Sequence, residues 1–150
     1  MRSPMQSRKR KQNMDHQFRP LSEQKNKYPP LVQAAVSLIE AQYSYLYGID
    51  ELADLLEVTK HHLIRVFTAG TGISPGKYLT DVRIFHAKLM LRSGENAPIE
   101  IIAGACGYSC GNYFSKVFKK HTGFTPTDYL KTAQRDIASP EEDVMEKFYL

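Results

Sequence analysis

The sequence contains one pattern twice, and this internal repeat limits the folds that the chain can adopt. Apolar, capping and turn residues recur first at an offset of 50 residues and then at an offset of 51. The matching pairs are Ile49 with Ile99, Ala53 with Ala103, Thr59 with Ser109, Phe67 with Phe118, Gly72 with Gly123, Pro75 with Pro126, and Tyr78 with Tyr129. A nearly constant offset indicates two copies of one structural unit, with one residue inserted near the start of the second helix of the second copy.

Each copy is predicted to be a helix-turn-helix. In the first copy, over about residues 50–72, Asp50 is expected to cap a short helix and Thr59 to cap the helix after it. In the second copy, over about 98–123, Ser109 is the expected cap of the second helix, and a closing helix follows over 126–135. Another amphipathic helix is expected from Pro30 to Tyr45, so the predicted fold is all-α.

A longer linker helix is predicted over residues 74–93, between the two copies. Ser74 can cap it, and Pro75 suits its first turn. Its apolar residues form two stripes that point in nearly opposite directions at about 100° per residue. One stripe holds Tyr78, Val82, Phe85 and Leu89, the other holds Ile84, Ala87 and Leu91, and a polar strip of Lys77, Asp81, Lys88 and Arg92 lies between them. Such a helix is expected to pack against a helical unit on each side, with Arg83 in a structural role.

The two ends of the chain differ in charge from its middle. Residues 1–29 carry eight Lys and Arg residues against two acidic residues, and have almost no apolar residues before Phe18. This composition predicts a disordered basic arm, which is either a nucleic-acid tether or a solvated leader. Residues 136–150 form an acidic tail without a predicted role. The 29 residues before Pro30 are too few for a separate sensing domain, so the chain is expected to stand alone or to be regulated by a partner.

Composition excludes several classes of protein. No apolar run approaches the length of a membrane span, so no membrane association is expected and the predicted location is the cytoplasm. The two cysteines, Cys106 and Cys110, cannot form a cysteine-rich zinc site alone, and the adjacent His61 and His62 point about 100° apart. No nucleophile with a base, phosphate loop or pair of carboxylates has a suitable spacing. We therefore expect no metal, no cofactor and no enzymatic activity.

The second helix of a helix-turn-helix, the recognition helix, presents its outer side chains to the major groove of DNA. Arg65 and Lys116 can pair with guanine, and Asn112 can pair with adenine. The predicted base-contacting residues are His61, Ile64, Arg65, Gly111, Asn112, Ser115 and Lys116. The predicted phosphate-contacting residues are Thr59, Lys60, Ser109, Lys119 and Lys120. An outer charged face on a single helix is usually only solvated, but the repeat favours DNA recognition here.

The segment IIAGACGYSCGNYFSKVFKKHTGFTPTDYL, from Ile101 to Leu130, resembles the signature of the AraC/XylS family of transcription regulators. The resemblance extends over about Ile49–Lys131. It implies two helix-turn-helix subdomains of homeodomain-like form, joined by a linker helix, that bind asymmetric DNA sites. Position by position, it places His61, Ile64 and Arg65 in the first base-contacting helix. Gly111, Asn112, Ser115 and Lys116 fall in the second.

The sequence departs from the family pattern at three places. Gly111 has no side chain to contact a base, Ile64 replaces what is often a polar residue, and the uncharged residues 68–70 stand where basic residues are common. We therefore expect the second copy to contribute more DNA affinity than the first.

The predicted function is a sequence-specific transcription regulator that binds double-stranded DNA through both copies. The resemblance further implies an activator that acts with RNA polymerase, as a monomer or a weak dimer. The alternative is a protein-interaction module that keeps the fold but has weak or lost DNA recognition. Gly111 and Ile64 are poor base-contacting residues, and residues 30–136, between the basic arm and the acidic tail, carry almost no net charge.

Overall fold

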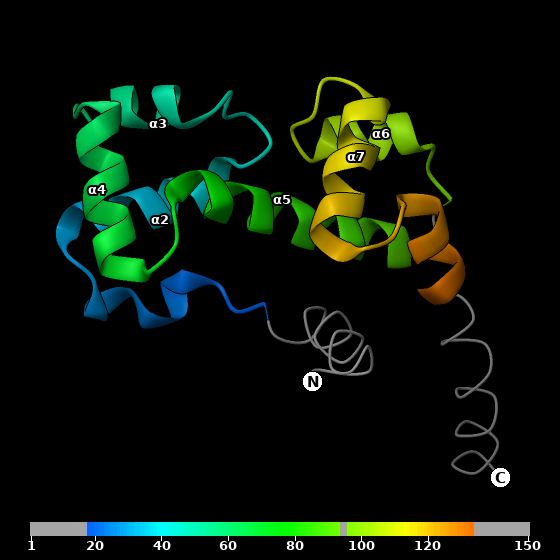
Figure 1. The fold of residues 1–150 in the computed structure, drawn as a ribbon, viewed down its shortest axis with the longest axis horizontal. Coiled ribbons are helices and arrows are strands. Elements are labelled where there is room, and N and C mark those ends of the chain that lie inside the picture. Colours follow the sequence, from blue (N-terminus) through cyan, green and yellow to red (C-terminus); the bar gives the residue numbers. More distant parts are fainter. Residues whose placement is uncertain (1–17, 94–95, 134–150) are drawn as a thin grey trace, which may run out of the picture.

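The computed structural model describes residues 18–93 and 96–133 of the 150-residue chain. Its labelled helices are η1 (Leu21–Lys27), α2 (Pro30–Gln42), α3 (Ile49–Leu55), α4 (Lys60–Thr71), α5 (Pro75–Arg92), α6 (Ile99–Ala105) and α7 (Gly111–Thr122). Residues 126–133 form a further helix, called the closing helix below. Figure 1 shows α5 through the middle of the molecule, with α2, α3 and α4 around one end and α6, α7 and the closing helix around the other. The prediction of an all-α fold with two helix-turn-helix units is confirmed.

The linker helix α5 joins two separate hydrophobic cores. Its first half packs into the first core, formed with α2, α3 and α4, and its second half packs into the second core, formed with α6, α7 and the closing helix. The change occurs between Val82 and Ile84, which lie about 200° apart around the helix axis. The largest fully buried side chains are aromatic in both cores: Phe67 and Tyr78 in the first, and Phe114 and Phe118 in the second. The two-sided apolar pattern of α5 therefore reflects burial in two cores.

Two side chains of α5 differ from the predicted stripes. Leu89 was expected to be buried but is 47% exposed, and Lys88 was expected on the polar strip but is only 7% exposed. Lys88 places its ammonium group 5.9 Å from the centre of the Tyr129 ring in the closing helix. The closing helix covers the side of α5 that carries Lys88. Periodicity alone does not indicate where such a neighbour lies.

The N-terminal arm is shorter than predicted, because residues 18–28 fold onto the first core. The Phe18 ring stacks on that of Phe85 with their centres 4.6 Å apart. The Leu21 amide donates to the Tyr78 hydroxyl at 2.9 Å, and that hydroxyl donates to Glu40 at 2.6 Å. Burial and the bond to Glu40 raise the pKa of Tyr78, so its hydroxyl stays protonated. The expectation of disorder up to residue 29 is wrong for this segment, here called the N-terminal strap (18–28), while residues 1–17 lie outside the described part of the chain.

The helix caps follow the predictions with two exceptions. Thr59 and Ser74 accept bonds from the amides of His62 and Lys77, as predicted. The predicted caps Asp50 and Ser109 are wrong: Asp50 lies inside the first turn of α3, and the cap of α7 is Cys110, whose sulfur accepts from the Tyr113 amide at 3.4 Å. Because these positions differ from the true caps by one or two residues, sequence spacing alone could not separate them.

Both recognition helices end in the same local structure. Gly72 and Gly123 adopt left-handed conformations, with φ of 84° and 88°. A threonine precedes each glycine, Thr71 in α4 and Thr122 in α7. The hydroxyl of each threonine donates to two carbonyls, one four residues before the threonine and one two residues after it. This shared ending turns the chain toward α5 in the first unit and toward the closing helix in the second.

Arg83 connects the two units at the middle of α5. Its guanidinium donates to the carbonyls of Tyr43, at 2.9 Å, and Leu46, in the loop between α2 and α3. The same group lies 5.3 Å from the centre of the Tyr108 ring in the second unit. Burial raises the pKa of Tyr108 to about 12, so this ring carries a neutral hydroxyl beside the cation. The structural role predicted for Arg83 is therefore a contact between units.

Gly107 makes this contact possible, and its substitution tests the arrangement. Its φ is +99°, and a Cβ atom there would lie 2.8 Å from the Tyr43 carbonyl oxygen and 2.9 Å from Arg83 Nε. We expect Gly107→Ala to lower the free energy of unfolding by at least about 2 kcal/mol, because it combines backbone strain with a clash. Urea denaturation followed by circular dichroism measures this change.

The matched control is Gly104→Ala, three residues earlier in α6, where a Cβ atom meets nothing within 4 Å. Alanine is the better helix former, so this variant should be unchanged or more stable by up to about 1 kcal/mol. Equal stability of the two variants would contradict the close packing at Gly107.

Candidate nucleic-acid interface

The recognition helices α4 and α7 stand at opposite ends of α5. Figure 1 shows both helices upright and both beginning at the upper edge of the molecule. Their inner faces are fixed by buried side chains, Leu63 and Phe67 in α4, and Phe114 and Phe118 in α7. Most of their other side chains are exposed. The repeat therefore produces two similar exposed faces in one chain.

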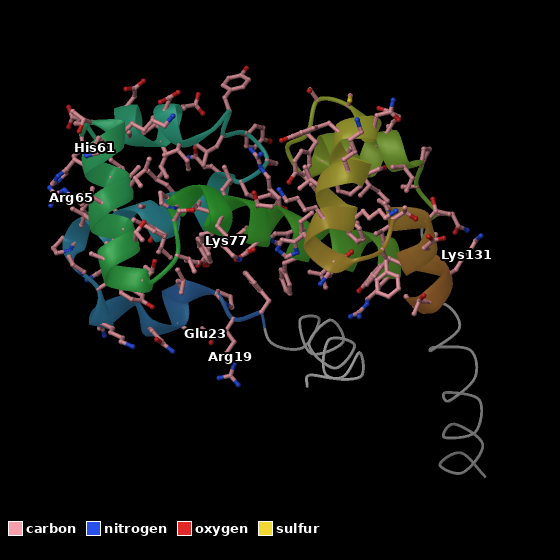
Figure 2. The ribbon with its side chains drawn as sticks, viewed as in Figure 1. Arg19, Glu23, His61, Arg65, Lys77 and Lys131 are labelled. Atoms are coloured by element: carbon pink, nitrogen blue, oxygen red, sulfur yellow. The ribbon has the colours of Figure 1, made fainter. Side chains whose placement is uncertain are left out.

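The exposed face of α4 carries three of the predicted base-contacting residues. His61 and Arg65 are exposed and lie toward the outer end of the first unit in Figure 2. Ile64 is 37% exposed. Arg65 Nη2 lies 3.0 Å from Nδ1 of His62, one turn earlier, which orients the guanidinium along the helix surface. His62 was not among the predicted contacts, but this bond gives it a part in positioning Arg65.

The exposed face of α7 carries Asn112 and Lys116, both exposed, and Ser115, which is half-buried. Tyr113, in the first turn, is 58% exposed and its ring lies 5.9 Å from that of Tyr108. Sequence reasoning did not select Tyr113 as a contact residue. Its position in the first turn of the predicted second recognition helix, next to Asn112, was the signal that could have found it.

The predicted base contact at Gly111 is wrong, because Gly111 is buried under Glu100. Its amide faces both carboxylate oxygens of Glu100 at 3.2 Å. A Cβ atom at this position would lie 2.6 Å from Glu100 Oε1. The absence of a side chain thus leaves room for the Glu100 carboxylate at the start of α7, where it accepts from the Gly111 amide.

The predicted phosphate-contacting residues are exposed, but they differ in their local bonds. Thr59 uses its hydroxyl to cap α4, and Lys60 pairs with Asp50 at 3.3 Å. Both members of that pair are more than half exposed, so water screens it and Lys60 can exchange Asp50 for another anion. Ser109 is exposed next to the true cap, and Lys119 and Lys120 are exposed in the last turn of α7.

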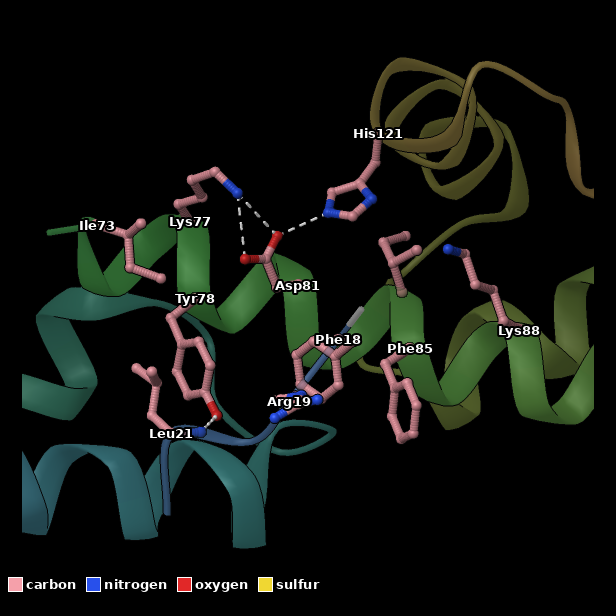
Figure 3. A pocket seen from close by; sticks show the side chains of 11 residues that line it. Phe18, Arg19, Leu21, Ile73, Lys77, Tyr78, Asp81, Phe85, Lys88 and His121 are labelled. Carbon is pink, nitrogen blue, oxygen red and sulfur yellow. Dashed lines mark hydrogen bonds and ion pairs between the residues drawn. The ribbon is translucent and has the colours of Figure 1, made fainter. Parts of the chain in front are cut away.

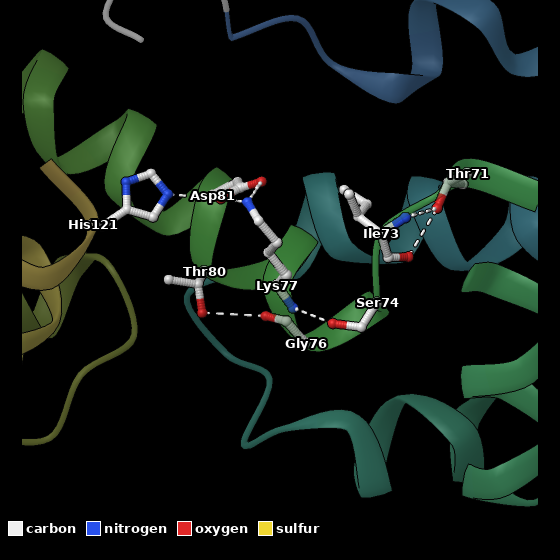
Figure 4. A network of polar contacts seen from close by, with 8 residues as sticks. All are labelled: Thr71, Ile73, Ser74, Gly76, Lys77, Thr80, Asp81 and His121. Carbon is white, nitrogen blue, oxygen red and sulfur yellow. Dashed lines mark hydrogen bonds and ion pairs between the residues drawn. The ribbon is translucent and has the colours of Figure 1, made fainter. Parts of the chain in front are cut away.

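A second polar contact holds α7 against the first unit. His121 Nε2, at the end of α7, lies 2.6 Å from Oδ1 of Asp81 in α5. Lys77 Nζ, one turn earlier in α5, donates to both carboxylate oxygens of Asp81 at 3.1 Å. Figure 4 shows this chain of contacts from α5 to α7. Asp81 and Arg83 lie about 200° apart around α5, so the two contacts between units flank the helix.

The rest of the surface limits the kind of site that this is. Among residues 18–93 and 96–133, no group of His, Cys, Asp or Glu side chains could hold a metal ion. No helix within these described ranges is long and apolar enough to cross a membrane. What the two units present is a pair of exposed helix faces that carry hydrogen-bonding and basic side chains.

Comparison with known proteins identifies the class. A family model described as a helix-turn-helix domain matches residues 52–132. The transcriptional activator RhaR of Yersinia pseudotuberculosis is 42% identical over 105 residues, which are 70% of this chain and 35% of that protein. The chain thus spans about a third of the length of the curated relatives it matches.

Solved structures show the same likeness. The C-terminal domain of AraT, a response regulator from Geobacillus stearothermophilus, is 34% identical to this chain, with a TM-score of 0.67. The match covers 71% of this chain and 88% of the AraT domain structure. A regulator from Chromobacterium violaceum with an AraC-type DNA-binding domain is 31% identical to this chain, with a TM-score of 0.61. That match covers 74% of this chain and 95% of the regulator's structure.

The fold and these likenesses define a helix-turn-helix domain of the kind found in DNA-binding transcription regulators. The chain belongs to the AraC/XylS family.

Thiol chemistry tests how the start of α7 is placed. Cys110, at the cap, is exposed, whereas Cys106 is buried and burial raises its pKa to about 11. We expect Ellman's reagent at about pH 8 to modify Cys110 in the folded protein and Cys106 only after denaturation, because the thiolate is the reacting form. The Cys110→Ser variant is the control. Rapid modification of that variant would contradict the burial of Cys106.

Proposed function

We propose that the protein is a sequence-specific transcription activator that inserts α4 and α7 into successive major-groove segments on one side of the DNA. The observation that carries this proposal is the equivalence of Arg65 and Lys116. They occupy the same position of the repeat, at an offset of 51 residues, and both are exposed on their helices. Two basic side chains at equivalent outer positions suit two similar contacts on one duplex.

The size of the linker supports this geometry. An α-helix of the 18 residues of α5 is roughly 27 Å long at 1.5 Å per residue. Successive major-groove segments on one face of DNA are about 34 Å apart. The recognition helices pack beside the ends of α5, which adds to the distance that the linker alone spans. A single chain can therefore contact both segments, and we propose a monomer or a weak dimer as the binding form.

Base and phosphate contacts are proposed for different residues. His61, Ile64, Arg65, Asn112, Ser115 and Lys116 are the proposed base-contacting residues, and Thr59, Lys60, Ser109, Lys119 and Lys120 are the proposed phosphate-contacting residues. Arg65 and Lys116 suit guanine and Asn112 suits adenine, because their donors and acceptors match those base edges. Activation through RNA polymerase is proposed because the relative RhaR is named a transcriptional activator.

Selection of bound duplexes from a random pool, followed by gel-shift titration over a salt series, tests this function. We expect a selected site with two conserved segments about one helical turn apart. The absence of binding to any duplex at low salt would overturn the proposal and favour the protein-interaction module.

Substitution of the two equivalent residues tests the base contacts. Arg65→Ala and Lys116→Ala are each expected to cost about 1–3 kcal/mol of binding free energy on the selected site and to relax specificity in their own segment. The control Lys131→Ala removes an exposed cation from the closing helix (Figure 2), and should leave specificity unchanged. A uniform loss of affinity over all sequences would assign Arg65 or Lys116 to phosphate instead.

Deletion of residues 2–11 tests the basic arm. These residues contain Arg2, Arg8, Lys9, Arg10 and Lys11. We expect the deletion to lower affinity for all duplexes alike and to reduce the dependence of affinity on salt, because each phosphate contact releases condensed counterions. Fluorescence anisotropy at several salt concentrations measures the slope. A loss confined to the selected site would contradict a tethering role.

A further inference from the structure

We propose that a pocket beneath the linker helix binds a small organic anion with a flat apolar body. The pocket has a volume of about 250 Å³ and lies where the N-terminal strap, α5 and the end of α7 meet. Figure 3 shows the rings of Tyr78, Phe18 and Phe85 below α5, and His121 reaching toward it from α7. The pocket is distinct from the outer faces of α4 and α7, and the proposed DNA contacts do not use it.

The walls of the pocket favour an apolar ligand. The apolar side chains of Leu21, Ile73 and Ile84 line it together with the aromatic rings. Phe18 and Phe85 are stacked 4.6 Å apart and half-buried, so their rings form part of the wall. A dry cavity of about 150 Å³ is enough to hold benzene. The larger volume here has room for a second ring or for a polar group on one ring.

The charges around the pocket favour an anion. Three basic side chains, Arg19, Lys77 and Lys88, line it with one acidic side chain, Asp81. Lys77 donates to both carboxylate oxygens of Asp81, so these two charges offset each other. Arg19, exposed at the edge of the pocket, adds a positive charge that no acidic side chain of the lining offsets. A carboxylate on an aromatic body fits both the walls and this charge.

The position of the pocket adds a functional consequence. Tyr78 and Phe85 belong to α5, Phe18 to the strap over the first core, and His121 to the recognition helix of the second unit. A ligand in the pocket therefore contacts groups from both helix-turn-helix units, beside the contact of Asp81 with His121. The proposed ligand class thus gives the chain a small-molecule site within the DNA-binding fold itself.

Calorimetric titration of the full chain with naphthoate, against naphthamide as a neutral analogue of the same shape, tests the proposal without DNA. We expect naphthoate to bind about tenfold more tightly, because hydrogen bonds to a charged acceptor are stronger than those to a neutral one. Arg19→Gln should weaken naphthoate binding about threefold and leave naphthamide unchanged, since Arg19 is exposed and its ion pair is screened. Lys131→Gln, an equal loss of charge on the closing helix, should change neither.

Two further measurements locate the bound ligand. In methyl spectra, naphthoate should shift the signals of Ile73 and Ile84, which line the pocket, and leave those of Ile64 and Ile102 unchanged. Ile73→Phe, which fills the pocket, should abolish binding of both compounds while circular dichroism remains that of the folded chain. Equal affinity for the two compounds, or shifts at Ile64 and Ile102, would overturn the proposal.

The acidic tail is the other occupant to be tested. It carries Glu141, Glu142 and Asp143 next to apolar residues. A full-length variant with Glu141→Gln, Glu142→Gln and Asp143→Asn should bind naphthoate with the affinity of the original chain. An increase of about tenfold on neutralising the tail would assign the pocket to the tail and overturn a small-molecule site. The outcome is independent of the proposed function, because all of these measurements are made without DNA.

Discussion

The contact of Arg83 with both units is the interaction on which the arrangement of the molecule depends. A partly buried guanidinium is costly unless its donors are bonded, and here the carbonyls of Tyr43 and Leu46 accept from it. These bonds hold the loop between α2 and α3 of the first unit, while the flat face of the cation meets Tyr108 of the second. Because Asp81 contacts His121 on the opposite side of α5, rotation of the second unit about the linker breaks one contact or the other. The two recognition helices are therefore held at one spacing and one angle.

The sequence predicted the architecture where the determining signal was local or repeated. The 50- and 51-residue offsets identified both units, and the opposite stripes on α5 indicated burial on two sides. The predictions failed where a non-local contact decided the outcome. The N-terminal strap contains several charged residues, a composition that favours disorder. However, the Phe18 ring stacks on that of Phe85, 67 residues later in the chain, and composition cannot predict this contact. Likewise, Leu89 has the period of a core residue but lies where no described neighbour covers it.

The candidate interface was predictable to a similar extent. The outer positions of Arg65, Asn112 and Lys116 follow from helical spacing once the buried positions are known. Gly111 was misassigned because Glu100, eleven residues earlier, packs over it and bonds to its amide. Tyr113 was missed because an aromatic residue next to core positions is usually buried, whereas here Phe114 fills the core and leaves Tyr113 outside. The assignment of individual side chains to bases and phosphates remains a proposal, since helical spacing determines exposure but not the contact made.

The two recognition helices share a structure but differ in charge, and this difference bears on how the units divide the proposed work. In the last turn of α7, Lys119 and Lys120 are exposed, whereas the equivalent residues of α4 are Thr68 and Ala69. Phosphate contacts supply salt-dependent affinity, while base contacts supply specificity. On this basis we propose that the second unit is the stronger anchor, and that the first adds specificity through Arg65 once the second is bound. The rigid link through Arg83 makes that second step effectively intramolecular, so a weakly charged first unit can still contribute to site selection.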